Sequence, residues 1–585
     1  MSAYRKPVLF QETTVSRRPT RLDLDKLIYF HRGLPGYSKT RLIDLPELAM
    51  ELNVRNVFMK DESDRFGLPS FKILGASWGT FTAICSLLGL PQDSSLDHLL
   101  KEATSCNVKL FAATDGNHGR AVARMGRLLS LITSIYVPSD LEDHAKQLIS
   151  GEGAQVITYD GDYDGAVQAA TKAAEITTNG LLIQDTSFPG YEDIPSSITQ
   201  GYSTIFREVD DELQLRGLQV DVIVTPVGVG SLAHAVVQHY KTLGMPETTR
   251  VVTVEPDTAA CFYRSLQRKN PAKISTAHTI MTGMNCGTVS HGAWQDLCHL
   301  VDASLTVSDF EAHQAVQYLR TQKISSGPCG ASSVAALRRL TIYDRAHLGL
   351  HPDTVIVLLN TEGDRPYDTP LDVSTDDPVE LTRLLTRIQS TNLTLASTQR
   401  TRETYIVDFI EAWLQHRDIE SCRLNQYLVV LPSSGLFQGG YKAQTSCLTA
   451  IQILLQIELH TVPGQNAQSI TREIESLLAK IAENQPQFRF KRPCVLFSRS
   501  ALKLDSGHPF ERLAAKAAEN ACEQSVKPIG LRFRCDTTPL DANGIPTVVF
   551  GPTGDGLPSD EEWMDVESIR KTERMISSLV AEFCG

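Results

Sequence analysis

The chain has 585 residues, of which 42% are hydrophobic and 21% charged, and its formal net charge is −12 at pH 7. A chain of this length is too long for one compact core, so we expect more than one domain. The acidic balance argues against nucleic acid or an anionic membrane surface as a partner.

The N-terminal stretch lacks the apolar core of a secretory signal, and no segment has the ~20 apolar residues that span a bilayer. Four arginines precede Asp23 with few acidic residues among them, so a mitochondrial address stays open. The twelve cysteines are scattered without CxxC spacing, which predicts neither a zinc ribbon nor a disulfide framework. The simplest interpretation is a cytoplasmic protein with reduced cysteines.

From Pro46 to about residue 370, short apolar runs alternate with helical patterns. The runs are mostly apolar on both faces, which is typical of buried parallel strands. The predicted strands are 57–59, 110–113, 134–137, 155–158, 222–224, 251–254 and 355–359. The helical patterns between them include 120–131, 163–178 and 232–243. This order predicts a doubly wound α/β domain.

Near residues 370–378 the pattern breaks into a polar stretch bracketed by prolines. We place the main boundary there, with one domain at 1–375 and a second at 376–585. Beyond the boundary, helices are predicted at 379–390, 404–414, 469–483, 509–521 and from about 566, with a strand at 547–550.

Lys72 is the first residue that could carry chemistry. It follows Ser70 and Phe71 at the start of a predicted helix, and Ile73 and Leu74 come next. Apolar neighbours would desolvate the amine, lower its pKa and make it nucleophilic enough to bond to a carbonyl carbon. By itself, the same pattern also describes a surface lysine on an amphipathic helix.

Four other clusters are candidates. Thr114–Gly119 leaves a strand and opens a helix, which is where ligands bind in open α/β sheets. Thr225–Ser231 places glycines before a helix start, where free N–H groups and the helix dipole suit a phosphate, although it is not a Walker A motif. Ser325–Gly330 and Asn360–Asp364 complete the set. Taken singly, the last three are also ordinary structural turns, and the first could be a tight turn.

Together and in this order, the five clusters resemble the fold-type-II pyridoxal-phosphate enzymes over roughly residues 25–370. The resemblance implies a tryptophan-synthase-β-like α/β fold, pyridoxal 5'-phosphate (PLP) as cofactor and a homodimer. It also implies that Lys72 holds the cofactor covalently, that Asn117 contacts the 3-oxygen of the ring and that Thr361 contacts the ring nitrogen. The phosphate is assigned to a loop made of Gly228, Val229, Gly230 and Ser231.

Within the family, the motifs are most similar to those of the diaminopropionate ammonia-lyases. Asp115 stands where serine and threonine dehydratases usually have Ser, and a carboxylate there could remove the Cα proton or serve an amine leaving group. The resemblance places Asp185 near the same substrate. We therefore expect β-elimination on 2,3-diaminopropionate, which yields pyruvate and ammonia.

The sequence leaves alternatives for the identity of the substrate. Where these lyases usually have Glu-Ser-Gly, this chain has Ser325-Ser326-Gly327, so one wall lacks an acidic group. Serine, threonine or another β-substituted amino acid, in elimination or β-replacement, is the nearest rival. A non-catalytic scaffold is a rival of another class, against which the lysine, the asparagine turn and the phosphate loop argue.

Two further patterns have open interpretations. The resemblance brings Cys261 and Cys286 close together, either as reduced thiols or as a pair near the active-site entrance. Gly75–Gly79 fits the G-x-S-x-G pattern of hydrolases, which requires a strand before the serine, whereas a helix is predicted here.

The second half, from about residue 378, resembles the acetylornithine deacetylase and succinyl-diaminopimelate desuccinylase family of zinc peptidases. It is much shorter than that family, lacks the H-x-D motif and has Pro558 where the final histidine ligand is expected. A two-metal site needs several imidazole and carboxylate ligands. We expect a degenerate metallopeptidase-like α/β domain without metal, kept for packing, dimer formation or control of access; a live zinc hydrolase is the alternative.

Overall fold

The computed structural model describes residues 5–11, 24–114, 116–139, 141–161, 163–242, 249–388, 403–419, 422–425, 428–430, 467–484, 507–527, 545–555 and 563–584. The chain forms two compact units, one of residues 1–374 with 388–435 and the other of residues 375–387 with 436–585. The boundary between family domains at 375/376 stays a prediction. Among the described residues, no helix has the length and apolar character needed to cross a membrane.

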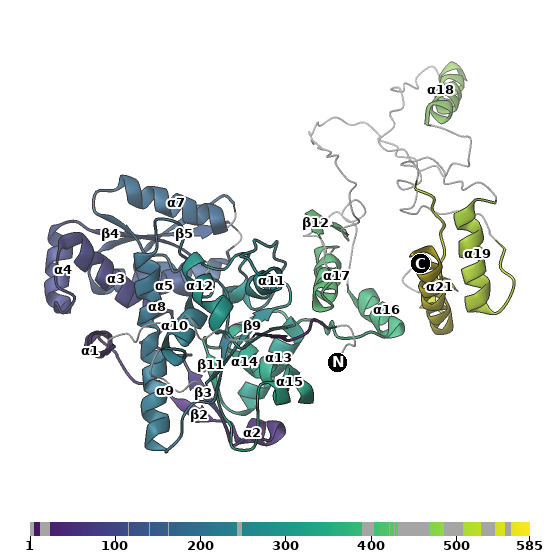
Figure 1. Cartoon of the computed structure of the whole chain (residues 1–585). Helices are drawn as coiled ribbons and strands as arrows, with labels where there is room; N and C mark the ends of the chain where they lie inside the picture. The colour runs from purple at the N-terminus through teal and green to yellow at the C-terminus, as the bar shows by residue number, and fades with distance from the viewer. Residues whose placement is uncertain are drawn as a thin grey trace. The chain divides into compact units, whose positions relative to one another are not determined.

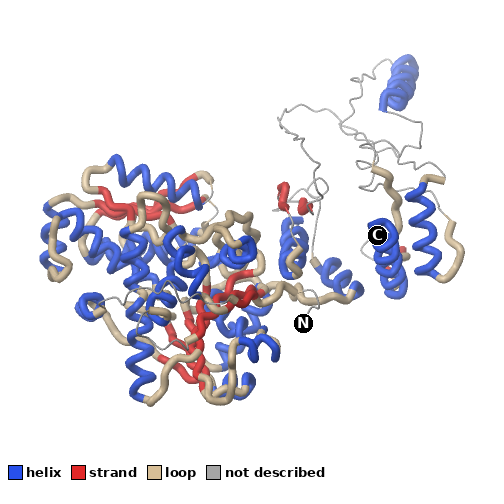
Figure 2. Tube along the Cα trace, in the orientation of Figure 1, coloured by secondary structure: helices blue, strands red, loops and turns tan. Residues whose placement is uncertain are grey.

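A seven-stranded sheet forms the centre of the first unit, with the strand order β1-β10-β9-β8-β11-β3-β2. Neighbouring strands from β10 to β3 are parallel, and the edge strands β1 and β2 run antiparallel to their neighbours. The strands are β1 (Leu9–Phe10), β2 (Leu42–Asp44), β3 (Asn56–Asp61), β8 (Val222–Pro226), β9 (Arg250–Pro256), β10 (Ala303–Val307) and β11 (Val355–Asn360). Figure 2 shows these strands in red, enclosed by helices in blue.

The inner strands are buried on both faces because their residues alternate between two apolar clusters. In β11, Val355, Val357 and Leu359 pack into one cluster, whereas Ile356 and Leu358 pack into the other. This two-sided burial explains why the inner strands are continuous apolar runs in the sequence. The first cluster includes residues of α3 (Lys72–Leu88), α5 (Asn117–Leu128), α8 (Asp193–Gly201), α9 (Ser203–Leu215), α10 (Ser231–Tyr240) and α12 (His291–Leu300). The second includes α2 (Pro46–Leu52), α13 (Asp309–Thr321) and α14 (Pro328–Arg339).

A second, four-stranded sheet has the order β6-β5-β4-β7, and all its strands are parallel. Its strands are β4 (Lys109–Ala113), β5 (Ile132–Pro138), β6 (Gln155–Tyr159) and β7 (Gly180–Leu182). One face is covered by α7 (Tyr163–Ile176), whose Ala166, Ala170 and Ala174 pack on Phe111 and Leu182 (Figure 1). The remaining helices of the first 374 residues are α1 (Asp25–Gly33), α4 (Leu96–Ser105), α6 (Asp143–Gly151), α11 (Cys261–Arg268), the 3-10 turn η1 (Thr282–Met284) and α15 (Ile342–His347).

The predicted α/β pattern is confirmed. All seven predicted strands are present, as β3, β4, β5, β6, β8, β9 and β11, and the three helical patterns are α5, α7 and α10. In these two sheets, four strands were not predicted, namely β1, β2, β7 and β10.

Helix α17 (Glu403–His416) belongs to the first unit and closes it against the N-terminal segment. His416 Nδ1 lies 2.7 Å from Asp257 Oδ2, with both side chains buried. The Lys6 amide donates to the His416 carbonyl at 3.1 Å, and Lys6 Nζ donates to the Asp257 carbonyl at 2.8 Å. Asp257, Glu311 and His416 could together face a metal ion. However, Arg5 pairs with Glu311 and Lys6 lies beside Asp257, so this cluster is already charge-compensated.

The second unit contains α16 (Pro378–Arg387), α18 (Ala467–Asn484), α19 (Pro509–Cys522), α21 (Val566–Cys584) and a short antiparallel pair, β14 (Gly554–Asp555) with β15 (Trp563–Met564). Helices α19 and α21 pack through small residues of α19 against Met575. The short pair β12 (Cys422–Asn425) and β13 (Leu428–Val430) belongs to the first unit. The strand predicted at 547–550 is wrong: these residues form no strand, and Phe550 is 38% exposed, as a core strand would not be.

Candidate active site

The carboxyl ends of three adjacent parallel strands carry most of the predicted site. Strands β8, β11 and β3 are neighbours in the large sheet. Thr361 follows β11, the glycine loop Val227–Gly230 follows β8, and the segment after β3 leads to Lys72 at the first position of α3. From the small sheet, Asn117 opens α5 after β4, and Asp185 comes shortly after β7. This is the edge of a parallel sheet at which ligands bind in open α/β folds.

Lys72 and Asp185 are brought into direct contact. Lys72 Nζ lies 2.6 Å from Asp185 Oδ2. Burial disfavours the charge on each side chain, but the opposite charge of the partner outweighs it, so the pKa of Lys72 is raised and that of Asp185 is lowered. The expectation that apolar neighbours lower the pKa of Lys72 is therefore wrong, because Asp185 was not counted. The amine must lose this proton before it can act as a nucleophile.

The turn after β4 is shaped by Thr114. Its Oγ1 accepts hydrogen bonds from the amides of Gly116 at 2.9 Å and Gly119 at 3.0 Å. A Cβ at Gly119 would lie 2.3 Å from Thr114 Cγ2, so only glycine fits beneath this turn. The result places Asn117, which is half-buried, at the start of α5. Asp115, predicted as a catalytic carboxylate, lies outside the described residues.

His118 is a neighbour of the acid that sequence reasoning did not single out. Its Nε2 lies 2.9 Å from the Ile183 carbonyl, which can only accept, so Nε2 carries the proton. Its Nδ1 lies 3.8 Å from Asp185 Oδ2 and has no hydrogen-bond partner among the described residues. Burial lowers the pKa of His118, so the imidazole beside the Asp185 carboxylate is neutral. The Gly-Asn-His-Gly motif pointed to this position, but not to its contact with Asp185.

The loop Val227–Ser231 suits a phosphate. Gly230 has a φ of +97°, which L side chains rarely adopt. A Cβ at Gly228 would lie 3.0 Å from the Gly283 carbonyl and 3.2 Å from Cys286 Sγ, so the backbone is closely packed on its outer side. Ser231 then starts α10, where unpaired N–H groups and the helix dipole favour an anion. With the Lys72 amine and the buried hydroxyl-bearing Thr361, this donor set fits the phosphate, aldehyde and ring of PLP.

The two cysteines near the loop are not joined by a disulfide. Cys261 is buried, and its Sγ lies 3.6 Å from the Gly228 carbonyl, while Cys286 is half-buried. Burial raises the pKa of Cys261 well above its usual value, so this thiol is a poor nucleophile.

Ser325, at the position where the sequence lacks the expected acidic residue, makes a contact that joins two loops. Its Oγ accepts from the amide of Asp364 at 3.0 Å, which joins the loop before α14 to the loop after β11. In the same region, Asn360 Nδ2 donates to the Ser325 carbonyl at 2.8 Å and to Asp61 Oδ1 at 2.9 Å. These bonds hold the backbone beside Thr361.

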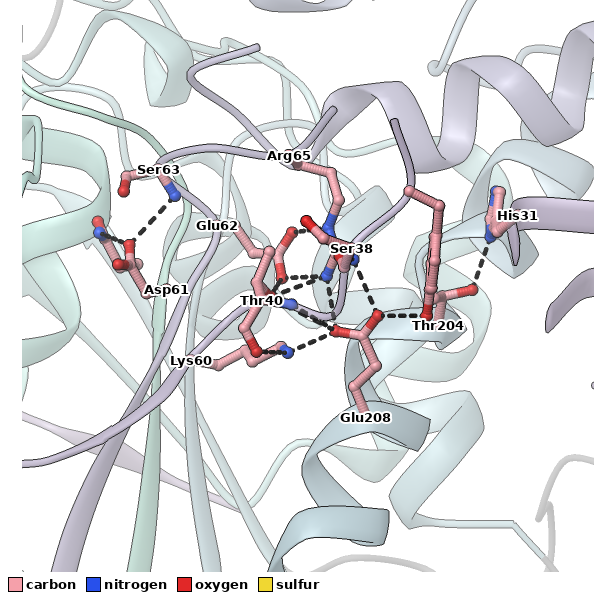
Figure 3. A network of polar contacts seen from close by, with 12 residues as sticks. His31, Ser38, Thr40, Lys60, Asp61, Glu62, Ser63, Arg65, Thr204 and Glu208 are labelled. Atoms are coloured by element: carbon pink, nitrogen blue, oxygen red, sulfur yellow. Dashed lines mark hydrogen bonds and ion pairs between the residues drawn. The ribbon is translucent and has the colours of Figure 1, made fainter. Parts of the chain in front are cut away.

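A buried ion network supports the segment that leads to Lys72 (Figure 3). Lys60 Nζ lies 2.5 Å from Glu208 Oε2, and Arg65 lies 2.8 Å from Glu208 and 2.6 Å from Glu62. Two cations and two anions compensate each other, which a buried network requires. Because Lys60 lies on β3, Arg65 in the following loop and Glu208 on α9, the network fixes this connection against α9.

His31 lies next to this network and joins three helices (Figure 3). Its Nε2 lies 3.0 Å from the Leu74 carbonyl, so Nε2 carries the proton, and Nδ1 accepts from Thr204 Oγ1 at 2.7 Å. These bonds connect α1, the first turn of α3 and α9. The helix that begins with Lys72 is therefore anchored only two residues beyond it.

Comparisons with known proteins agree with this site. The family model of pyridoxal-phosphate dependent enzymes matches residues 34–362. Diaminopropionate ammonia-lyase of Escherichia coli (strain K12) is 30% identical over 347 residues, which cover 57% of this chain and 87% of the relative. The enzyme of that name from Salmonella typhimurium is 30% identical over 368 residues, covering 60% and 91%. The crystal structure of the E. coli enzyme with an aminoacrylate-PLP azomethine reaction intermediate is similar with a TM-score of 0.55 and 27% identity, over 62% of this chain and 95% of that one.

The chain therefore belongs to the pyridoxal-phosphate dependent enzyme family, and its cofactor is PLP. It is a carbon–nitrogen lyase of that family, which acts by β-elimination on a small amino acid. The predicted fold type II is confirmed for the first unit.

Proposed function

We propose that the chain converts 2,3-diaminopropionate to pyruvate and ammonia. The observation that supports this proposal best is the contact between Lys72 and Asp185, because a carboxylate then lies beside the amine that we propose as the holder of the cofactor. Among similar chains, the E. coli and Salmonella proteins carry the name diaminopropionate ammonia-lyase. A carboxylate can accept an ammonium group of a diamino acid, whereas a hydroxyl leaving group has no charge to pair with it.

In the proposed reaction, Lys72 holds the cofactor and, once released, carries protons to and from the Cα of the substrate. Asp185 binds the second ammonium group of the substrate and keeps it protonated, so that this group can leave as neutral ammonia. Asp115 is retained as the other proposed proton acceptor. Bound PLP supplies the electron sink that makes the Cα proton removable. Loss of that proton and of the β-amine, followed by hydrolysis with one water, gives one pyruvate and two molecules of ammonia.

The other residues have proposed binding roles. Asn117 would contact the 3-oxygen of the ring and Thr361 the ring nitrogen. The phosphate would be held by the loop Gly228, Val229, Gly230 and Ser231, for which the left-handed Gly230 and the start of α10 give independent support.

The test is a substrate panel on the purified full-length protein. Ammonia and pyruvate are measured with 2,3-diaminopropionate, serine and threonine, and the Lys72→Ala variant serves as the control for non-enzymatic release. The proposal expects two ammonias per pyruvate and a kcat/KM for diaminopropionate at least tenfold above the other two. Pyruvate from serine or threonine but not from diaminopropionate would establish the rival dehydratase.

For the second half, we propose a degenerate zinc-peptidase-like domain that binds no metal. The loss of the H-x-D motif and of the final histidine supports this proposal. Metal analysis of the purified chain tests it, since stoichiometric zinc would contradict it. A homodimer and a cytoplasmic location are proposed on the family resemblance and on the scattered cysteines, and are tested by light scattering and cell fractionation.

A further inference from the structure

Tyr202 is a buried residue for which no role has been assigned. It joins α8 to α9, and its side chain is completely buried. Its hydroxyl has no hydrogen-bond partner among the described residues. A buried, unpaired hydroxyl is costly, so it calls for an explanation.

The phenol ring is held against the start of α3. Its ring stacks edge-on to Phe71, the residue before Lys72, at 4.8 Å between centroids. A Cβ at Gly75 would lie 2.5 Å from Tyr202 Cε1, and one at Gly201 would lie 2.5 Å from the Leu74 carbonyl. The two glycines therefore let the backbone and the ring come close to the first turn of α3.

The same packing explains the G-x-S-x-G pattern. Gly79 also lacks room for a side chain, because a Cβ there would lie 2.4 Å from Ile198 Cγ1. Ser77 lies inside α3 and its Oγ donates to the Leu74 carbonyl at 3.2 Å, so no hydrolase turn is present here. Gly75 and Gly79 serve the contact of α3 with α8.

The hydroxyl lies in the active site. It lies close to the Lys72 amine, the Asp185 carboxylate and the hydroxyl of Ser231, the first residue of α10, but none of them meets it in hydrogen-bond geometry. Burial raises the pKa of Tyr202, so the phenol keeps its proton and acts as a hydrogen-bond donor rather than as a base.

We propose that Tyr202 is a cofactor-binding residue whose hydroxyl donates a hydrogen bond to PLP, on the side of the site bounded by Lys72 and Ser231. The cofactor then supplies the acceptor that the described residues lack. This proposal depends on the cofactor and not on the identity of the substrate, so it can fail while the proposed reaction stands.

The experiment compares Tyr202→Phe with the full-length wild type. The dissociation constant of PLP is measured by absorbance titration of apoprotein, and thermal stability is measured with and without PLP. We expect PLP affinity to fall about tenfold, as one lost hydrogen bond of about 1.4 kcal/mol implies. The apo form should be at least as stable as wild type, because an unpaired buried hydroxyl has been removed.

Tyr240→Phe is the matched control. Tyr240 is also buried, but its hydroxyl already donates to Asp210 Oδ1 at 3.3 Å. Its loss should destabilise the apo and PLP-bound forms equally and leave PLP affinity unchanged.

Unchanged PLP affinity in Tyr202→Phe overturns the proposal. If the apo and PLP-bound forms of that variant then lose stability equally, Tyr202 has a structural role only. If that variant does not fold, Tyr202→Leu, which also lacks the hydroxyl, takes its place. Its folded fraction, as judged by circular dichroism, must then show the expected loss of PLP affinity of about tenfold or more.

Discussion

Lys72 Nζ and Asp185 Oδ2 lie 2.6 Å apart, although the lysine follows a strand of the large sheet and the aspartate follows a strand of the small one. The contact therefore spans the two layers of the lyase fold. Asp185 favours the protonated form of the Lys72 amine, and in the proposed reaction this amine must lose that proton before it can act as a nucleophile.

Asp185→Asn should separate the two roles of this carboxylate. With the charge removed, burial remains the main influence on Lys72, so its pKa should fall. Apoprotein should then bind PLP covalently at a lower pH than wild type, while turnover should fall by about a hundredfold or more. Stopped-flow absorbance of PLP binding across pH measures the first effect and ammonia release measures the second. Asp143→Asn, at a highly exposed carboxylate, is the control and should change neither.

His31 should make the fold sensitive to acid. Burial lowers the pKa of His31 to about 3, so below its ordinary pKa near 6.5 the unfolded chain binds a proton that the folded chain does not. Stability should therefore fall as pH falls from 6.5 toward 3. His31→Gln should be about 1–2 kcal/mol less stable at pH 7 but lose less between pH 7 and pH 4. Urea unfolding at both pH values checks this, and the exposed His98→Gln should keep the wild-type pH dependence; an unaltered acid slope in His31→Gln would contradict the assignment.

Glu208→Gln should disrupt the network in Figure 3. Burial opposes the charge of Glu208, but Arg65 and Lys60 lower its pKa, so the ionised form stabilises the fold above pH 4.5 and this contribution is lost as pH falls. The substitution leaves two buried cations facing one carboxylate and should cost about 3–5 kcal/mol of unfolding free energy. Thermal melting measures it. Glu212→Gln, on the same helix with more exposed partners Lys39 and Arg216, should cost about 1 kcal/mol or less, and equal effects of the two would argue against the network.

His416→Ala should loosen α17 from the lyase body. The variant removes the partner of the buried Asp257 carboxylate and should cost about 2–3 kcal/mol, since hydrogen bonds to charged groups contribute that much. Limited proteolysis should then cut in α17 sooner than in wild type. Tyr405→Ala, at a side chain that is 56% exposed on the same helix, should behave as wild type. Unchanged protection of α17 in His416→Ala would show that other contacts hold the helix.

The sequence predicts best those strands whose apolar run is uninterrupted because both faces of the strand are buried. Strand β11 is apolar throughout because both faces are buried, and it was predicted within a residue. Strand β10 is equally buried, but Ser304 and Thr306 interrupt its apolar run, so it was missed. Strand β7 is only three residues long and begins with glycine, which weakens a strand signal.

The site shows the same division. Motif resemblance is the source of the proposed roles of Lys72, Asn117, the phosphate loop and Asp185, because each lies on a short local motif. It assigned no role to Tyr202, whose position against α3 depends on Gly75 and Gly201. Nor could it give the pKa of Lys72, which depends on a partner 113 residues away.

The closure of the first unit by Lys6 and His416 also bears on how the protein is made. The segment around Lys6 and a helix beyond residue 400 complete the same buried cluster. A ribosome that has finished residue 374 still needs about 2–8 seconds to reach His416 at 5–20 residues per second. During that interval Asp257 lacks its imidazole partner, and α17 cannot yet pack against the N-terminal segment of the nascent chain. Translation as far as His416 is thus needed before this buried cluster can be completed, and a chain that ended between residue 374 and α17 would contain the predicted PLP-site residues but no closing helix.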